Sequence, residues 1–331
     1  MKRVVMLVLL SLVILGCESE SKGPNIVKIE GREIIDVHEQ IYTIDQVPRF
    51  LNAMDRAGVD RIVVLGSPDA TFIYKEGFEN HHVNNRDIMQ MVKENPDRFI
   101  AFPTVDPRNE SELKVFKQYI EDGATGLRIF SGQHAWFYRF IGPVNRTEVY
   151  PTLEYCEENG IPVMWNMNPG KGTLMAEFED VLQKFPNLNV VCPHFCLSSI
   201  NSSRFEYLMD KYPNMYTDIS FGHFFEDGLK RISRNTTKFR DLFVKYQDRI
   251  LFGIDLVVTN NTIPANGDPS EWMTNLTICY RDMLERENYD CSVHIKRVFN
   301  VDQKNLNGLD LSRKILNKVY EENPKEWMNL D

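Results

Sequence analysis

Histidine, aspartate and amide side chains stand near the ends of several apolar segments of the sequence. Asp36, His38 and Gln40 alternate along one such segment, so they share a face if the segment is a strand. Asp255 ends a second apolar segment and His194 ends a third. Imidazole and carboxylate groups bind metal ions and transfer protons in many enzymes. These residue types therefore indicate a site for metal-assisted or acid–base chemistry.

Two further polar side chains belong to apolar segments. Arg128 lies inside one, and its guanidinium group suits a substrate carboxylate or phosphate. Asn166 ends another. A buried network in which these groups satisfy one another is the alternative interpretation, and it suits any one residue taken alone. Their joint occurrence favours a functional site.

Aromatic residues alternate with histidine and arginine in two segments that are expected to be loops. One holds His134 and Trp136, and the other holds His223. Such segments suit recognition of a small planar or aromatic carboxylic acid, although they could equally pack on each other as an apolar plug. We predict that His134, Trp136 and His223 contact the substrate together with Arg128.

Short apolar segments alternate with amphipathic segments from residue 34 onward. This alternation predicts an α/β fold with a parallel sheet, and eight strands suit a closed (β/α)8 TIM-like barrel. The predicted strands are Ile34–His38, Arg61–Gly66, Phe99–Thr104, Gly126–Phe130, Ile161–Asn166, Leu188–His194, Met215–Ser220 and Arg249–Asp255.

The amphipathic segments between these strands predict helices, and Ala57-Gly58 and Asn159-Gly160 are typical of helix ends. The predicted helices are Gln46–Ala57, Asn84–Glu94, Glu110–Glu121, Thr147–Asn159, Leu174–Phe185, Ser203–Tyr212, Lys238–Tyr246, Glu271–Arg286 and a last helix, Asp310–Glu322. No segment has the composition of a domain boundary, so residues 31–331 are predicted to form one domain.

In such a barrel, active sites lie at the carboxyl ends of the strands. Most of the seven histidines fall at that predicted end, and only His294 falls elsewhere. The histidines at that end are His38, His81, His82, His134, His194 and His223. This distribution favours a functional mouth of the barrel.

The N-terminal residues have the pattern of an export signal. Met1-Lys2-Arg3 is followed by an apolar run from Val4 to Leu15, which is too short to span a bilayer as a mature helix. Gly16-Cys17 after this run resembles the bacterial lipobox, in which the cysteine is lipidated. We predict a signal peptide over residues 1–17, a polar tether over 18–30 and a lipid-anchored protein exported to the cell envelope. A signal peptide without lipidation, or a short anchor, is the alternative.

Charge and cysteine content narrow the range of partners. The 331-residue chain carries a formal net charge of −9 with scattered basic residues, which argues against nucleic acid. A small-molecule substrate is the expected partner, and a homo-oligomer remains open.

Apart from Cys17 the chain has an odd number of cysteines, so it lacks a disulfide framework, although one or two bridges remain open. Cys192 and Cys196 flank His194 and are either a soft metal site or two small buried cysteines.

Several segments resemble a known family. Residues 34–40, with the sequence IIDVHEQ, resemble the Asp-x-His-x-His opening of the amidohydrolase-related family of metal-dependent hydrolases and decarboxylases. Residues 249–255 (RILFGID) resemble its closing motif, in which Gly-Ser-Asp is usual. Residues 160–163 (GIPV) and 190–194 (VVCPH) are similar to its fifth and sixth strands. The resemblance extends over residues 34–327 and implies a TIM barrel.

The resemblance also implies a set of metal ligands. It assigns His38, Gln40, Asn166 and Asp255 to the metal and His194 to catalysis. Two of the expected imidazoles are replaced by the amides Gln40 and Asn166, which offer only neutral carbonyl oxygens. One divalent ion is therefore expected, either zinc or a harder ion such as Mn or Mg, and a site without metal is the alternative.

The resulting prediction is a hydrolase for a small organic acid, amide, ester or lactone. Asp255 is the predicted general base, and His194 is predicted to polarise the substrate carbonyl. A metal-dependent carboxy-lyase is one alternative. A non-catalytic or metal-free lipid-anchored barrel that binds a small ligand is the other, because Gln40 and Asn166 depart from the family pattern.

Overall fold

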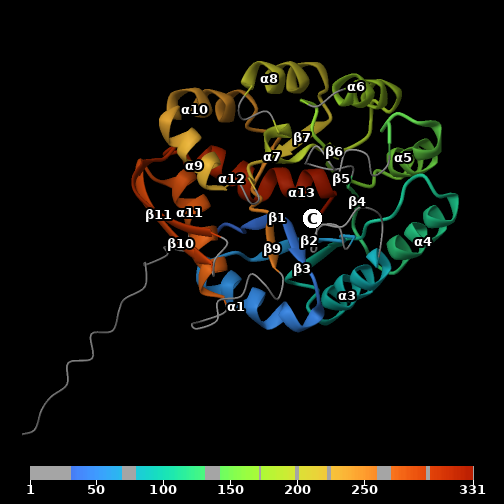
Figure 1. The fold of residues 1–331 in the computed structure, drawn as a ribbon, viewed down its shortest axis with the longest axis horizontal. Coiled ribbons are helices and arrows are strands. Elements are labelled where there is room, and N and C mark those ends of the chain that lie inside the picture. Colours follow the sequence, from blue (N-terminus) through green and yellow to red (C-terminus); the bar gives the residue numbers. More distant parts are fainter. Residues whose placement is uncertain are drawn as a thin grey trace, which may run out of the picture.

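Parallel strands form a ring at the centre of the structure, and helices surround this ring (Figure 1). The computed structural model describes residues 31–68, 80–130, 142–170, 173–197, 201–221, 225–258, 270–295 and 299–330. The α/β barrel predicted from the alternation of apolar and amphipathic segments is confirmed.

The strands of the ring form two arcs, in the order β3-β2-β1-β9 and β4-β5-β6-β7-β8. A parallel bridge between Thr104 and Arg128 joins the arcs on one side. On the other side Val37 N donates to Phe252 O at 2.9 Å. The strands are β1 (Ile35–Ile41), β2 (Arg61–Leu65), β3 (Phe99–Phe102), β4 (Leu127–Phe130), β5 (Val163–Asn166), β6 (Val190–Val191), β7 (Met215–Asp218), β8 (Ile250–Leu251) and β9 (Leu256–Val258).

Each predicted helix is present in the structure, with ends that differ by a few residues. The surrounding helices are α1 (Val47–Ala57), α3 (His81–Glu94), α4 (Glu110–Glu121), α5 (Tyr150–Glu158), α6 (Leu174–Lys184), α8 (Ser202–Lys211), α9 (Phe225–Arg234), α10 (Thr236–Lys245) and α11 (Glu271–Glu285). Short 3-10 turns precede α1 (η1, Ile44–Gln46) and α5 (η2, Thr147–Val149). No prediction covered α9.

An antiparallel hairpin extends the barrel on one side, where β10 (Asn288–Ile295) pairs with β11 (Phe299–Asn307). Tyr289, Cys291 and Val293 are buried, and the residues between them are exposed, as expected for a strand with one covered face. A disulfide between Cys279 and Cys291 ties the hairpin to α11. The sequence prediction missed this hairpin.

The C-terminal segment closes the amino-terminal end of the barrel, here called the floor. It consists of α12 (Arg313–Asn317), the π-helical turn η4 (Lys318–Glu322) and α13 (Asn323–Met328). In Figure 1, α13 lies across the ring and the C-terminus lies near its centre. The predicted last helix stopped at Glu322, two residues before Pro324, but helical structure continues because proline suits the first turn of α13.

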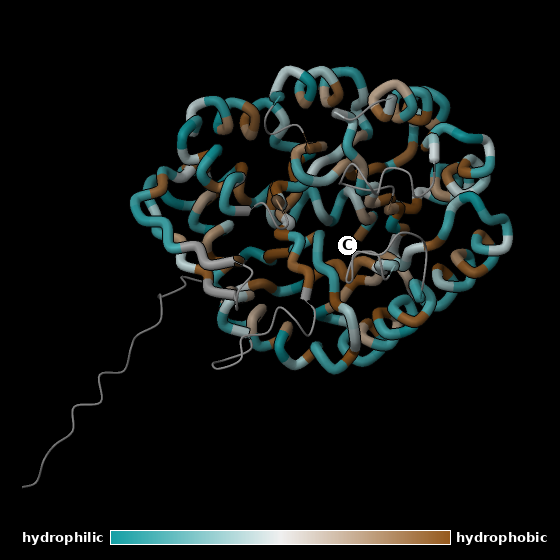
Figure 2. Tube along the Cα trace, in the orientation of Figure 1, coloured by the Kyte–Doolittle hydropathy of each residue, from teal (hydrophilic) through white to brown (hydrophobic). Residues whose placement is uncertain are grey.

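Two apolar layers hold the strands in place. Helix-facing side chains form one large cluster with the surrounding helices. The side chains that fill the barrel interior are Ile35, Val37, Val63, Leu65, Ile100, Phe102, Met164, Val191, Tyr216 and Leu251, with Trp327 and Met328 of the floor. Figure 2 shows hydrophobic residues concentrated toward the ring and hydrophilic residues on the outer turns of the helices.

A bulge in β1 overturns one expectation. Asp36 pairs with Ile62 and Glu39 pairs with Val64, so the register shifts between them. Ile62 and Val64 belong to the helix-facing layer, and Asp36 and Glu39 lie on that side with them. The prediction that Asp36 shares a face with His38 and Gln40 is therefore wrong, because the bulge reverses the alternation.

Among the helices in the described part of the chain, none combines the length and the apolar composition needed to cross a bilayer.

Candidate active site

Polar side chains from both arcs of strands meet at the carboxyl end of the barrel, here called the mouth. They are buried, although several of them are ionisable. The residues that form the mouth are His38 and Gln40 from β1, Ser67 after β2, Arg128 from β4, Asn166 from β5, His194 after β6, Asp218 and Ser220 from the end of β7, and Asp255 after β8.

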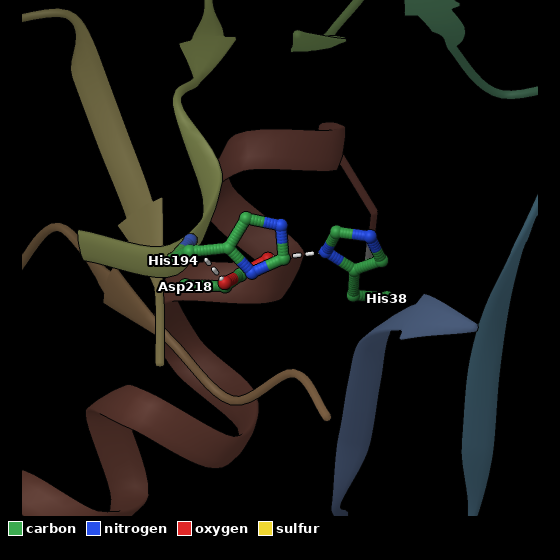
Figure 3. Close-up of side chains that lie close together, drawn as sticks. All are labelled: His38, His194 and Asp218. Carbon is green, nitrogen blue, oxygen red and sulfur yellow. Dashed lines mark hydrogen bonds and ion pairs between the residues drawn. The ribbon is translucent and has the colours of Figure 1, made fainter. Parts of the chain in front are cut away.

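His38 lies between two carboxylates. Its Nδ1 donates to Asp218 Oδ2 at 2.6 Å, and its Nε2 is 3.2 Å from Asp255 Oδ1. Figure 3 shows the His38 ring pointing from β1 toward Asp218 and His194. Burial opposes protonation of the ring, but Asp255 and Asp218 outweigh it and raise the pKa of His38 to about 9. Without a bound cation, His38 therefore supplies the positive charge between these acids.

His194 stands in a left-handed turn. β6 ends at Val191, and the four residues His194, Phe195, Cys196 and Leu197 have φ values of 61°, 52°, 50° and 47°. This region costs an L-residue roughly 1–2 kcal/mol. A disulfide between Cys192 and Cys196 spans the turn, and His194 N donates to Asp218 Oδ1 at 2.8 Å.

This turn corrects two expectations. The predicted strand Leu188–His194 is too long at its end, so Cys192, His194 and Cys196 do not share a strand face. The soft metal site considered for the two cysteines is also wrong, because their sulfurs form a disulfide, whereas the alternative of two buried cysteines agrees with their burial.

The His194 side chain is oriented like that of His38. Its Nδ1 is 2.7 Å from Ser220 Oγ and 3.2 Å from Ser220 O, while its Nε2 is 3.8 Å from Asp255 Oδ2. The two imidazole rings lie 5.1 Å apart, centroid to centroid. Burial lowers the pKa of His194 despite the nearby carboxylates, so this ring is the neutral one of the pair.

Asp218 organises this half of the mouth, and the sequence prediction did not name it. Its Oδ2 accepts from His38, while its Oδ1 accepts from His194 N, from Ser220 N at 3.1 Å and from Ser220 Oγ at 2.6 Å. Burial would raise the pKa of Asp218, but His38 and these donors hold it below its usual value. A carboxylate at the end of an apolar strand was the available signal.

A second network fills the other half of the mouth. Gln40 Nε2 donates to Asp255 Oδ1 at 2.5 Å, and Gln40 Oε1 accepts from Ser67 Oγ at 3.0 Å. Arg128 Nη1 donates to Ser67 Oγ and, at 3.0 Å, to Gly66 O. Arg128 Nη2 is buried and has no hydrogen-bond partner among the described residues. Burial lowers the pKa of Arg128 to about 9, and Asp255 opposes that shift.

The predicted site residues thus fall into three groups. His38, Gln40, His194 and Asp255 converge directly. Asn166 lies beside Arg128, from which its Oδ1 accepts a hydrogen bond at 3.2 Å. The others lie outside the described residues, and these are His134, Trp136, His223 and the predicted lipidation residue Cys17.

The donors around Asp255 fit a divalent ion. His38 Nε2 is buried and makes no hydrogen bond within the described residues, although Asp255 Oδ1 is nearby. Both imidazoles have Nδ1 occupied by oxygen atoms, an arrangement that orients histidine ligands in metal sites. Among the described residues of the mouth, the group whose ligand atoms lie within 4.8 Å of one another is His38, His194 and Asp218, and it does not include Asp255. Two imidazoles and the Asp255 carboxylate form a suitable set for zinc or a harder ion.

Comparison with known sequences gives a family match over most of the chain. The pattern of a protein family described as amidohydrolase matches residues 68–330, which includes His194, Asp218 and Asp255. β1, with His38 and Gln40, precedes the matched range. A search of curated proteins finds no match.

Solved structures share the fold at low sequence identity. A probable 2-pyrone-4,6-dicarboxylic acid hydrolase from Acinetobacter baumannii aligns with a TM-score of 0.59 and 12% identity over 90% of this chain and 100% of its own. A 2,6-dihydroxybenzoate decarboxylase from Rhizobium aligns with a TM-score of 0.55 and 13% identity, over 90% of this chain and 99% of its own. A zinc-bound amidohydrolase from Burkholderia multivorans aligns with a TM-score of 0.57 and 10% identity, over 90% of this chain and 100% of its own.

Proposed function

The chain belongs to the amidohydrolase family, and we propose that it is a metal-dependent hydrolase acting on a small carboxylate-bearing ester, lactone or amide. The observation that carries the proposal is the convergence of His38 Nε2 and His194 Nε2 on the Asp255 carboxylate, at 3.2 Å and 3.8 Å. The hydrolase and the zinc-bound amidohydrolase among the similar structures support it at the level of the fold.

His38, His194 and Asp255 are the residues that would hold the ion. When bound, a divalent ion supplies Lewis-acid activation of water and of a substrate carbonyl oxygen. Asp218 holds the Nδ1 proton of His38, and Ser220 engages Nδ1 of His194. These contacts leave the Nε2 atom of each ring on the side of the Asp255 carboxylate.

Asp255 is the residue that accepts the proton in this proposal. Its Oδ1 accepts a hydrogen bond from Gln40 and lies near His38, whereas its Oδ2 lies on the side of His194. We assign Oδ2 as the atom that takes the proton of the attacking water, because Oδ1 already has a donor. Gln40 then acts as a fixed donor that prevents rotation of the carboxylate.

Arg128 is the residue that binds the substrate carboxylate. Three of its contacts are fixed by Asn166, Gly66 and Ser67, and Nη2 keeps a donor for an anion. A guanidinium group that is already held in place loses little freedom when it binds a carboxylate. This contact orients the reacting carbonyl toward Asp255.

The two amide positions offer a direct test of where the ion binds. Gln40 contacts Asp255, so Gln40→His adds an imidazole beside the carboxylate and is expected to strengthen zinc binding. Asn166 contacts Arg128, so Asn166→His disturbs the anion-binding side, and we expect little gain. Zinc affinities of the two variants, measured by competition with a coloured chelator, decide this. Equal gains would contradict the proposed centre.

The decisive experiment combines metal content with turnover. Purified protein is expected to hold about one ion per barrel site and to hydrolyse members of a panel of carboxylate-bearing lactones, esters and amides. His38→Ala is expected to lose this ion. Asp255→Asn is expected to lose turnover by about 10⁴-fold, the upper range for loss of a general base. Full turnover in Asp255→Asn would overturn the proposal.

A metal-free barrel that binds a small acid is the second candidate. The observation that favours it is the Arg128 guanidinium, which Gly66 and Ser67 hold in place while Nη2 keeps a donor for an anion, an arrangement that needs no ion. Protein that takes up no ion after incubation with Zn, Mn or Mg, yet binds organic acids through Arg128, would favour this candidate over the hydrolase.

We also propose that the protein is exported and tethered to the cell envelope through a lipid on Cys17. The disulfides Cys192–Cys196 and Cys279–Cys291 support export, because such bonds persist in oxidising compartments. Cys17→Ser is expected to move the protein from the membrane fraction to the soluble fraction of the envelope.

A further inference from the structure

A second group of metal-ligand side chains lies outside the barrel, between the first turns of α3 and α4. His81 and His82 begin α3, and Glu112 lies in the first turn of α4. His81 Nε2 is 3.0 Å from Glu112 Oε2, and His82 Nε2 is 2.9 Å from Glu112 Oε1. Figure 1 shows α3 and α4 side by side on the flank of the barrel.

We propose that His81, His82 and Glu112 form a second metal site, which takes one Zn²⁺ or a similar transition-metal ion and clamps α3 to α4. Two imidazoles and a carboxylate are a common protein ligand set for zinc, with a fourth position left for water. Each of the three residues offers a ligand atom within 4.8 Å of the others. No residue of this group belongs to the mouth.

An ion fits this group after a local rearrangement of the Glu112 carboxylate. Bonds of about 2.1 Å in a tetrahedral site place ligand atoms about 3.4 Å apart. His81 Nε2 and His82 Nε2 now contact different oxygens of Glu112, at 3.0 and 2.9 Å, so zinc binding requires the carboxylate to turn until one oxygen lies about 3.4 Å from both nitrogens. Each imidazole then presents its Nε2 lone pair and carries its proton on Nδ1.

The two histidines are held in a converging arrangement. Consecutive helical residues normally point about 100° apart, but these rings lie 4.0 Å apart with a 38° interplanar angle. The left-handed residue Asn80, with φ of 55°, directs the chain into the helix at this point. The His81 and Glu112 side chains are mostly buried, and His82 is 40% exposed, so the group has one open side for a water ligand.

An ion at this position would fix the start of α3, which touches the mouth through other residues. Asn84 Nδ2 donates to Ile41 O at 2.8 Å, and Asn84 Oδ1 accepts from Ser67 N at 2.8 Å. Ser67 in turn contacts Gln40. We therefore assign the site a structural role, in which metal stabilises the fold without taking part in the reaction.

The test uses Co²⁺ and Zn²⁺ on the whole protein, with variants at each site. Co²⁺ is expected to give a visible absorption spectrum with a component that disappears in His82→Ala and in Glu112→Gln. Loss of one ligand is expected to weaken binding by at least about 100-fold, since loss of a mere outer contact costs 10- to 100-fold. Glu110→Gln, an exposed glutamate of the same helix turn, is the matched control and should keep the component.

Thermal stability gives a second readout. Saturating zinc is expected to raise the melting temperature of the unaltered protein and of Glu110→Gln, and the part of this rise due to α3 and α4 should vanish in His82→Ala. The Co²⁺ spectra and melting temperatures are also measured in His38→Ala, which removes the contribution of the mouth. The mouth and the group between α3 and α4 are thereby tested independently, so either metal site can fail without the other. Unchanged Co²⁺ spectra in both His82→Ala and Glu112→Gln would show that the group is only a hydrogen-bonded clamp.

Discussion

The mouth and the floor of the barrel are built on the same strands but hold opposite kinds of side chain. The mouth buries His38, Asp218, Asp255 and Arg128, each of which needs partners to offset its desolvation. The floor buries Trp327, which lies 5.1 Å from Phe102 between ring centroids. The buried polar side chain of this segment is Asn323, whose Nδ2 donates to Ile250 O and to Gln247 O, each at 2.8 Å.

The backbone conformation also differs between the mouth and the floor. Asp255 and the turn from His194 to Leu197 are in left-handed conformations that glycine usually adopts. The floor helix from Asn323 to Met328 has proline in its first turn, and its left-handed residue, Asn329, is the C-cap, a position where this conformation is usual. Strain therefore gathers where the proposed chemistry occurs, and the floor contributes stability that offsets it.

The largest expected effect is at the floor. Trp327→Ala empties the centre of the barrel interior and is expected to lower the free energy of unfolding by about 3–5 kcal/mol. Urea unfolding followed by circular dichroism measures this. Because the floor and the mouth are separate, the folded fraction of Trp327→Ala is expected to bind metal at the mouth with unchanged affinity. If Trp327→Ala abolished metal binding in folded protein, the two ends would not be separable.

The strand and helix pattern was predictable because buried parallel strands and amphipathic helices leave different periods in the sequence. β10 and β11 were missed although Tyr289, Cys291 and Val293 alternate, because a pattern of eight strands and their helices leaves no place for a hairpin. α13 was missed because the predicted last helix ended at Glu322, whereas Pro324 is compatible with a first helical turn.

The mouth was predictable only in part. His38, Gln40 and Asp255 were expected to meet, and the structure brings them together. The bulge in β1 and the left-handed turn at His194 depend on tertiary contacts, so no local pattern announces them. Asp218 could have been found by applying to β7 the rule used for β8, that a carboxylate ending an apolar strand marks the mouth.

The two disulfides provide a second test of the contrast, with an intermediate effect. Cys279→Ser with Cys291→Ser removes a link twelve residues long on the flank and is expected to cost about 3 kcal/mol of stability. Cys192→Ser with Cys196→Ser removes a link of four residues and is expected to cost about 2 kcal/mol. Chemical unfolding of both double variants measures these costs.

Only the second pair should also change the mouth. Without the Cys192–Cys196 bond, the left-handed turn can relax toward ordinary backbone angles, which moves His194 away from Asp255. Metal affinity at the mouth is therefore expected to fall in this double variant and to stay unchanged in the other. Equal affinities in both would indicate that contacts such as His194 N to Asp218 hold the turn by themselves.

The smallest expected effect comes from a single proton. In Asp218→Asn the side-chain oxygen should stay with the three donors that Oδ1 now accepts, namely His194 N, Ser220 N and Ser220 Oγ. The amide nitrogen then faces His38 Nδ1, which must become an acceptor, so the His38 proton moves to Nε2. Because Nε2 is the atom expected to bind the ion, metal affinity should fall by about 10- to 100-fold.

The matched control for this change is Asp248→Asn, which removes a surface carboxylate paired with Lys318. It should leave metal affinity unchanged, because exposed ion pairs contribute little and Asp248 precedes β8, at the opposite end of that strand from Asp255. Chelator competition with Zn²⁺ compares the two variants directly. If Asp218→Asn bound zinc as tightly as Asp248→Asn, the tautomer of His38 would not control the mouth, and His194 with Asp255 would have to hold the ion without it.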